Sequence, residues 1–296
     1  MKVIINPEYS FLSNFINELP DTFNETGEII YNSRNQIRVY SIEGIDIAVK
    51  SFKIPIIFNR IAYTYLRKSK AARSYLHGIK LLEMGFNTPT PIAYIETYKS
   101  GLLYRSFYIS IYDKHGDTIR RLTENKDDYD TEYKLKDLSH FIANIHKENI
   151  HHIDLSPGNI LISKGSNSKY QFSLIDINRL KFESLSKEEA LHNFERLFRS
   201  KEISTKVALL YAKERNWNEA DTIERVNKYC DIFFSNLAIH YSKKQIRKEQ
   251  GLLKSLFGPI QLFNISRIFN SKYKYHLYEK YIEKYDWREV IKKSME

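Results

Sequence analysis

The stretch His-His-Ile-Asp-Leu-Ser-Pro-Gly-Asn-Ile-Leu-Ile, residues 151–162, decides the fold of this chain. Asp154 and Asn159 lie five residues apart in it, on either side of a Pro-Gly pair. The Pro-Gly turn leads into the apolar run Ile-Leu-Ile at residues 160–162, and this pattern is typical of a short buried strand.

A second apolar run, residues 170–175, ends in Asp176. The segment between the runs, residues 163–169, is rich in Ser, Gly and Asn, so the two runs predict an antiparallel hairpin. Antiparallel pairing puts the start of the first strand beside the end of the second. Asn159 and Asp176 should therefore converge, with Asp154 one turn away.

These side chains suit phosphoryl transfer, which needs a metal held against the phosphates and a carboxylate that orients the attacking hydroxyl. Mg²⁺ prefers hard oxygen ligands, and Asp176 and the amide oxygen of Asn159 can supply them. Asp154 is then left as the general base. The alternative is an ordinary turn with a capping Asp, and the hairpin that ends in Asp176 weighs against it.

The motif His-x-Asp-x-x-x-x-Asn followed by a later Asp resembles the active site of protein-kinase-like phosphotransferases. The resemblance implies that His152 is a buried, hydrogen-bonded support under the metal-binding Asp. His151, His152 and Asp154 could instead bind a transition metal, but the sequence shows no second His or Cys cluster with suitable spacing.

Three short strands are predicted upstream, at residues 28–31, 36–42 and 45–52. The third contains Ala48-Val49-Lys50, which resembles the kinase strand whose Lys reaches the ATP phosphates, so Lys50 is the phosphate-binding candidate. A Gly-rich loop is absent from the first turn. We expect that turn to supply backbone N–H groups instead, from Asn32, Ser33, Arg34 and Asn35.

Two further strands are predicted within residues 93–112. They should lead into a hinge near Ile111 to Asp113, where backbone groups could read adenine.

Residues 69–84 should form the helix whose Glu pairs with the strand Lys in kinases. Leu76 and His77 occupy its central turn, however, and no Asp or Glu occurs between Asp46 and Glu83. We therefore expect Lys50 to be held by Asp176 alone or by Glu83. A nucleotide-binding pseudokinase scaffold is the non-enzymatic alternative.

Five segments together resemble the lipopolysaccharide kinase family, the Kdo and heptose kinases of the lipopolysaccharide inner core. The resemblance implies a bilobal kinase fold, ATP with Mg²⁺ or Mn²⁺, and a sugar hydroxyl of the lipid A-linked core oligosaccharide as acceptor. A RIO-like protein kinase is the other enzymatic alternative. The segments that carry the resemblance are residues 34–35, 48–53, 69–75, 85–92 and 174–179.

The predicted fold class is α+β, with a small β-rich N-lobe over residues 1–112 and a larger, mainly helical C-lobe over residues 113–296. Residues 1–27 are predicted to cap the small lobe. Apolar residues recur at three and four from residue 134 onward, and residues 186–296 are predicted to form further helices.

The acid-free interval also carries a concentrated positive charge, in a chain of net charge +10. Such a field attracts polyanions, and acidic lipid A phosphates and an anionic inner-membrane surface are the partners expected here. A solvated basic face is the alternative. Nucleic acid is a competing polyanion, but the sequence contains no recognised nucleic-acid module. The candidates for capture of acceptor or membrane are Arg60, Arg67, Lys68, Lys70 and Arg73.

The N-terminus lacks the pattern of a secretory signal, and no run approaches the length of apolar chain that spans a bilayer. The sequence therefore predicts a cytoplasmic protein, peripheral to the inner membrane. Cys230 is predicted to be a buried thiol. Tyr and Trp interleave with Lys over residues 272–287, which indicates a membrane-interface helix, a surface that stacks on single-stranded nucleic acid, or packing against the large lobe. Packing against the large lobe is the interpretation favoured here.

Overall fold

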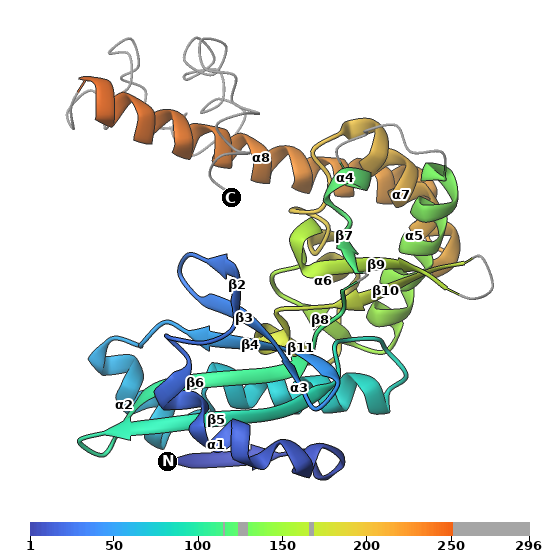
Figure 1. Ribbon diagram of the computed structural model, residues 1–296. Coiled ribbons are helices and arrows are strands. Elements are labelled where there is room, and N and C mark those ends of the chain that lie inside the picture. Colours follow the sequence, from blue (N-terminus) through green and yellow to red (C-terminus); the bar gives the residue numbers. More distant parts are fainter. Residues whose placement is uncertain (115, 124–129, 166–168, 251–296) are drawn as a thin grey trace. The chain divides into compact units, whose positions relative to one another are not determined.

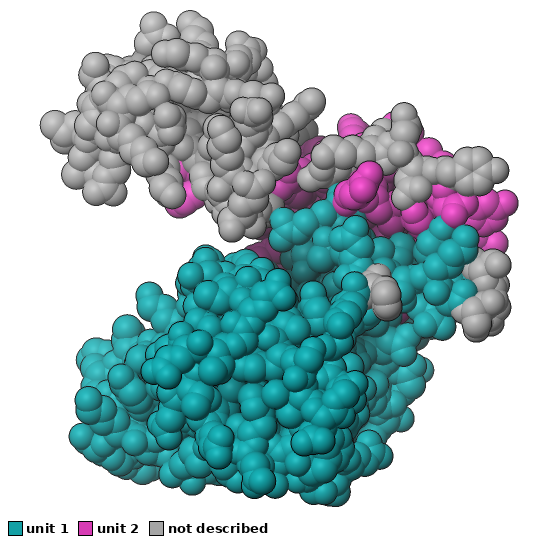
Figure 2. Space-filling model, in the orientation of Figure 1, with its two compact units in different colours: residues 1–120, 144–184 teal, residues 121–143, 185–296 magenta. Residues whose placement is uncertain are grey.

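The computed structural model describes residues 1–114, 116–123, 130–165 and 169–250 (Figure 1). The chain forms two compact units, coloured teal and magenta in Figure 2. The first unit comprises residues 1–120 and 144–184, and the second comprises residues 121–143 and 185–296. Every candidate site residue lies in the first unit. The lobe boundary between residues 112 and 113 stays a prediction.

The first unit is built on a six-stranded antiparallel sheet with the strand order β1-β5-β6-β4-β3-β2. The three strands predicted before residue 53 are confirmed, the first of them one residue longer than expected. The strands are β1 (Lys2–Ile5), β2 (Glu28–Asn32), β3 (Gln36–Ile42), β4 (Ile45–Phe52), β5 (Pro91–Lys99) and β6 (Leu102–Ile111).

One face of this sheet packs against the N-terminal segment, which forms the short 3₁₀ helix η1 (Pro7–Leu12) and helix α1 (Ser13–Thr22). Leu12, Ile16 and Leu19 join Ile47 and Val49 of the sheet in one buried cluster. The segment that was predicted to cap the small lobe thus contributes the edge strand β1 and one layer of the core.

The opposite face of the sheet carries helix α3 (Lys70–Glu83), preceded by the short helix α2 (Ile57–Tyr65). Side chains alternate along a strand, so Lys50 and Phe52 point away from the Ile47 side and toward α3. Phe52 packs with Ala71 and Tyr75 of the helix. The Ser69 side chain caps α3 by accepting a hydrogen bond from the Ala72 amide, and the helix ends before Gly85, which has a φ of +80°.

The predicted hairpin is confirmed: β9 (Ile160–Lys164) pairs with β10 (Tyr170–Leu174) in antiparallel register, with Ile160 opposite Leu174. Strand β7 (Asp117–Thr118) extends this pair at its other side. Strand β8 (Ile150–His152), before the catalytic stretch, pairs with β11 (Leu180–Phe182) after it. Two short 3₁₀ turns complete the region, η2 (Pro157–Asn159) and η3 (Ile177–Arg179).

Helices dominate the second unit, as predicted for the C-terminal part. Helix α5 (Thr131–Lys147) crosses the division between the units, and the short α4 (Arg120–Thr123) begins at it. Helices α6 (Lys187–His192) and α7 (Lys201–Arg215) both contact the long α8 (Glu219–Gln250).

Cys230 is buried in α8, as predicted, and burial raises the pKa of its thiol to about 12. The predicted aromatic and basic stretch at residues 272–287 lies outside the described residues. Within the part of the chain that the structure describes, no helix is long and apolar enough to cross a bilayer.

Candidate active site

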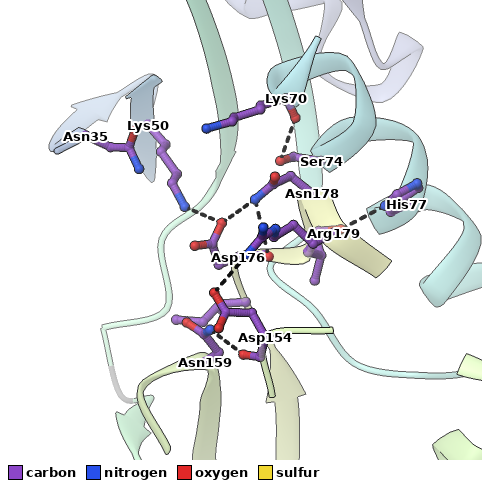
Figure 3. Close-up of polar contacts among 12 residues, drawn as sticks. Asn35, Lys50, Lys70, Ser74, His77, Asp154, Asn159, Asp176, Asn178 and Arg179 are labelled. Carbon is purple, nitrogen blue, oxygen red and sulfur yellow. Dashed lines mark hydrogen bonds and ion pairs between the residues drawn. The ribbon is translucent and has the colours of Figure 1, made fainter. Parts of the chain in front are cut away.

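Lys50 and Asp176 form an ion pair at the centre of the site (Figure 3). Lys50 Nζ lies 2.6 Å from Asp176 Oδ1, and the Lys50 side chain is largely buried. Strand β4 presents Lys50 between its paired neighbours Ile37 of β3 and Tyr108 of β6. Glu83, the other partner considered for Lys50, is exposed at the end of α3. Asp176 therefore supplies the counter-charge of Lys50.

Asp176 follows the hairpin in a left-handed backbone conformation, with φ 53° and ψ 41°. This conformation is uncommon for a residue other than Gly, although Asp and Asn tolerate it best. Burial would raise the pKa of the Asp176 carboxyl, but the charge of Lys50 and hydrogen bonds from Lys50 and Asn178 lower that pKa below its ordinary value. Asp176 is therefore ionised at neutral pH, as a ligand for a hard cation must be.

Asn159 lies beside Asp176 as the hairpin predicted, because the Ile175 amide donates to the Asn159 carbonyl oxygen at 3.0 Å. The Asn159 side-chain nitrogen donates to the Asp154 carbonyl oxygen at 2.8 Å. Since the amide nitrogen is used in this bond, the side-chain oxygen is the Asn159 atom that can bind a metal. Asp154, Asn159 and Asp176 are thus brought together, and their oxygens suit Mg²⁺ or Mn²⁺.

His152 is fully buried beneath these residues. Its Nδ1 accepts a hydrogen bond from the Asp154 amide, so Nε2 carries the proton and donates to the Ile175 carbonyl oxygen at 3.1 Å. Burial lowers the pKa of His152 and keeps the ring neutral. The ring therefore ties the residue before Asp176 to the turn that carries Asp154. Among the described residues, no cluster of His, Cys and acidic side chains has the geometry of a transition-metal site.

Asn178 and Arg179, two and three positions after Asp176, belong to the site and were not predicted from the sequence. The Asn178 side-chain nitrogen donates to Asp176 Oδ1 at 2.6 Å, and Asn178 is buried. Arg179 Nη1 lies 3.8 Å from Asp154 Oδ2. The Asp-Ile-Asn-Arg segment at residues 176–179 could have suggested both, since it stands where a kinase carries its metal-binding Asp.

Helix α3 is held against the Asp176 segment by a histidine and a glycine. His77 Nδ1 donates to the Ile177 carbonyl oxygen at 2.8 Å, and Leu76 is exposed, so neither side chain faces Lys50. Gly78 permits the close approach, because a Cβ there would lie 2.5 Å from Pro91 Cγ and 3.2 Å from Ile177 Cδ1. These contacts attach α3 to Ile177, the residue after Asp176. The attachment does not use the acidic side chain that kinases place on this helix.

A cavity of about 500 Å³ opens between the sheet and the hairpin, within the size range of small-molecule sites. Lys50, Asn159 and Asp176 are among its polar lining residues. Ala48 of the sheet and Leu161 of the hairpin contribute apolar walls. A flat apolar base could pack between these walls, with its phosphates toward Lys50.

The predicted phosphate-binding turn reaches this cavity at one residue. Asn35 lines it, and the Asn35 Oδ1 atom accepts a hydrogen bond from the Lys53 amide at 3.2 Å. Asn32, Ser33 and Arg34 are not among the lining residues, and Arg34 lines a neighbouring groove instead.

The predicted hinge, Ile111 to Asp113, lines the cavity throughout. Its first two amides are already used, because Ile111 donates to the Thr90 carbonyl oxygen and Tyr112 to the Asp46 carbonyl oxygen. An adenine ring would therefore form hydrogen bonds with other backbone groups of this segment. Arg120, which sequence reasoning missed, also lines the cavity, with its guanidinium over Gly158.

The structure separates the basic residues that the sequence grouped together. The Arg60 guanidinium donates to the carbonyl oxygens of Leu103 and Lys99, at 2.8 and 3.0 Å. Arg67 and Lys68 are exposed.

Lys70 and Arg73 are half-buried on the first turns of α3. The pKa of Lys70 is lowered by burial and by Arg34, against the opposing charge of Asp176. Burial is also the main cause of the lowered pKa of Arg73. Of the five basic candidates, Lys70 therefore lies within the electrostatic field of the Asp176 site.

The model of the lipopolysaccharide kinase (Kdo/WaaP) family matches residues 50–229, which is more than half of the chain. This chain belongs to the lipopolysaccharide kinase (Kdo/WaaP) family. The match begins at Lys50 and includes Asp154, Asn159 and Asp176. The resemblance drawn from the sequence motifs is thereby confirmed, and the chain is a kinase.

One solved structure agrees with this assignment at the level of the fold. The chain is similar to WaaP in a structure described as WaaP in complex with acyl carrier protein, with a TM-score of 0.54 and 14% sequence identity over 77% of this chain and 98% of that chain. A MAP kinase from Leishmania major, LmaMPK10, gives a TM-score of 0.38 and 13% identity over 73% of this chain and 65% of that chain. No curated protein sequence matches the chain. The predicted kinase-like α+β fold is confirmed.

Proposed function

We propose that this member of the lipopolysaccharide kinase family transfers the γ-phosphate of ATP to a sugar hydroxyl, of Kdo or heptose, in the lipid A-linked inner core. The observation that carries the proposal is that Lys50, Asn159 and Asp176 line a single cavity, with Asp154 hydrogen-bonded to Asn159 beside it. Family membership supports the lipopolysaccharide core as the substrate class. We propose that the reaction takes place at the cytoplasmic face of the inner membrane.

Each of these side chains has one proposed task. Lys50 binds the ATP phosphates, and Asp176 holds it in place when the nucleotide is absent. Asp176 and Asn159 hold Mg²⁺, and the cation, when bound, neutralises charge on the phosphates. Their oxygen donors and the lowered pKa of Asp176 fit this cation.

Asp154 is the proposed general base, because its carboxylate lies in the same turn as Asn159 and would accept the proton of the acceptor hydroxyl. Arg179 is positioned to orient that carboxylate, given the 3.8 Å between Arg179 Nη1 and Asp154 Oδ2. The proposed base thus lies in the turn that precedes the hairpin, while Lys50 lies on the sheet.

Purified protein, ATP and Mg²⁺ should transfer phosphate to a Kdo-bearing or heptose-bearing lipid A acceptor, which mass spectrometry of the product would detect. Lipid A-core from cells that lack the gene should carry one phosphate fewer than that from the parent strain. An unchanged number of core phosphates, together with phosphorylation of a protein substrate, would favour the protein-kinase alternative. Nucleotide binding without transfer to any acceptor would favour the pseudokinase scaffold.

A further inference from the structure

Helix α2 (Ile57–Tyr65) and its two flanking segments expose an unusual number of large apolar side chains. Phe58 is 77% exposed, Leu66 82% and Tyr65 70%. We name this set the α2 patch, and its members are Ile54, Ile56, Ile57, Phe58, Ile61, Tyr65 and Leu66. A contiguous exposed apolar surface on a folded domain indicates an interaction site.

The α2 patch is exposed because the helix is attached to the protein by its polar side. Arg60 donates hydrogen bonds to the carbonyl oxygens of Leu103 and Lys99, and the Thr64 hydroxyl accepts one from the Leu103 amide at 2.9 Å. Residues 57, 61 and 65 are spaced by four and therefore lie on one face of the helix. The hydrogen bonds of Arg60 and Thr64 leave this face exposed. A helix at the surface of a globular domain ordinarily buries its apolar face and exposes its polar one. Here the arrangement is reversed.

Basic residues border the α2 patch at both ends. Lys53 is exposed before it, and Arg67 and Lys68 are exposed after it. No acidic residue occurs from position 47 to position 82, so the surroundings of the patch carry no opposing charge from this segment. Apolar side chains flanked by Lys and Arg are the pattern of a helix that lies in the interface of an anionic membrane.

We propose that the α2 patch inserts into the interfacial layer of an anionic lipid bilayer, while Lys53, Arg67 and Lys68 contact the lipid headgroups. The helix has nine residues, which suits it to lie in the interface and not to span the bilayer. Two properties of the patch, its outward apolar face and its basic border, point independently to this ligand.

A groove of about 330 Å³ lies beside the α2 patch. Its lining includes Ile54 and Ile56 from the patch and Arg34 and Lys70 from the side of Asp176. A headgroup sugar whose lipid is held at the patch could extend along this groove toward Lys70. This last step rests on the proposed function, whereas membrane binding by the patch does not.

A second copy of the chain is the competing occupant of the patch. A two-fold symmetric contact would place identical patches against each other and bring Lys53, Arg67 and Lys68 of both copies together. Such like-charge contacts are unfavourable, so the basic border favours an anionic surface over self-association.

Flotation of the full chain with phosphatidylcholine vesicles, with and without phosphatidylglycerol, tests the proposal. The double variant Phe58→Ser with Leu66→Ser removes two apolar side chains that would insert into the bilayer. The double variant Lys53→Glu with Lys68→Glu reverses the charge of two basic residues that border the patch. Binding to the anionic vesicles should fall by about tenfold or more in each double variant. Phe11→Ser with Tyr133→Ser, which alters exposed aromatic residues elsewhere, is the matched control and should bind like the wild type.

Equal vesicle binding by the wild type and the Phe58/Leu66 variant would overturn the proposal. Equal binding of the wild type to neutral and anionic vesicles would also overturn it. A third contrary result would be light scattering that shows a dimer for the wild type and a monomer for the Phe58/Leu66 variant. Transfer to a soluble, delipidated core sugar should be unchanged in that variant. If even the wild type fails to phosphorylate any core sugar while vesicle binding behaves as stated, the proposed function fails and the membrane site stands.

Discussion

Lys50 Nζ lies 2.6 Å from Asp176 Oδ1, although 126 residues of chain separate the two. This pair joins the sheet to the end of the hairpin, and both residues line the cavity. Asn178 donates to the same Asp176 oxygen within the segment, and His77 donates to the neighbouring Ile177 carbonyl oxygen, so the Asp176 segment is held both by β4 and by α3.

Asp176→Ala should abolish the metal dependence of nucleotide binding, because the proposed magnesium site loses its charged ligand. Titration calorimetry with ATP, in the presence and absence of Mg²⁺, measures this directly. Asp21→Ala, an exposed carboxylate of α1, should keep the metal dependence of the wild type. Equal ATP affinity of Asp176→Ala and the wild type in Mg²⁺ would contradict the metal assignment.

Asp154→Asn should separate binding from chemistry. The variant keeps the shape of the turn and should bind ATP with Mg²⁺ normally, while phosphoryl transfer falls by roughly 10²- to 10⁴-fold through loss of the general base. Transfer rates to a Kdo-bearing or heptose-bearing acceptor provide the measurement. Near wild-type transfer would rule out Asp154 as the base.

Arg60→Met should destabilise the first unit, because Arg60 holds α2 through hydrogen bonds to backbone carbonyl oxygens. A loss of about 1–3 kcal/mol in the free energy of unfolding is expected for charged hydrogen bonds of this kind. Denaturant titration measures the loss, and Lys68→Met, at an exposed position, should stay close to the wild type. If Arg60→Met leaves stability unchanged but weakens acceptor capture, the earlier assignment of Arg60 to capture is the better one.

Gly78→Ala should destabilise the protein even though Ala is the better helix former by about 1 kcal/mol. The added methyl group would lie 2.5 Å from Pro91 Cγ, so α3 would have to move away from the sheet and from Ile177. A net loss of about 1–3 kcal/mol is expected from such overpacking. Glu83→Ala, exposed on the same helix, serves as the control in thermal unfolding, and a raised melting temperature for Gly78→Ala would refute this packing.

Acidification should destabilise the fold through its buried histidines. The pKa values of His77 and His152 are lowered in the folded protein, chiefly by burial. Below the unfolded value of about 6.5, the unfolded chain therefore binds more protons than the folded one, and stability falls as the pH drops. Above that pH the stabilising contribution is fully present.

His77→Gln isolates part of this effect, because Gln can still donate to the Ile177 carbonyl oxygen and does not titrate. The free energy of unfolding of this variant should depend less on pH than that of the wild type between pH 7 and mildly acidic conditions. Parallel pH curves for wild type and His77→Gln would show that His77 does not contribute.

The sequence by itself determined the local parts of the site. The apolar runs and the turn residues between them predicted the hairpin and the convergence of Asn159 with Asp176, because antiparallel pairing puts the start of the first strand beside the end of the second. Apolar runs separated by turn residues also predicted the strands β3 and β4, and therefore the strand position of Lys50.

Only the tertiary structure decided which distant groups complete the site. The sequence left Asp176 and Glu83 as possible partners of Lys50, and the folded structure pairs Lys50 with Asp176. The contact of His77 with Ile177 depends on how α3 packs against the sheet, which no local pattern specifies. Helix α2 shows the difference most clearly, since its apolar spacing would ordinarily predict a buried face. Arg60 and Thr64 bind Leu103 at the start of β6 instead, and those long-range hydrogen bonds leave the apolar face of α2 exposed.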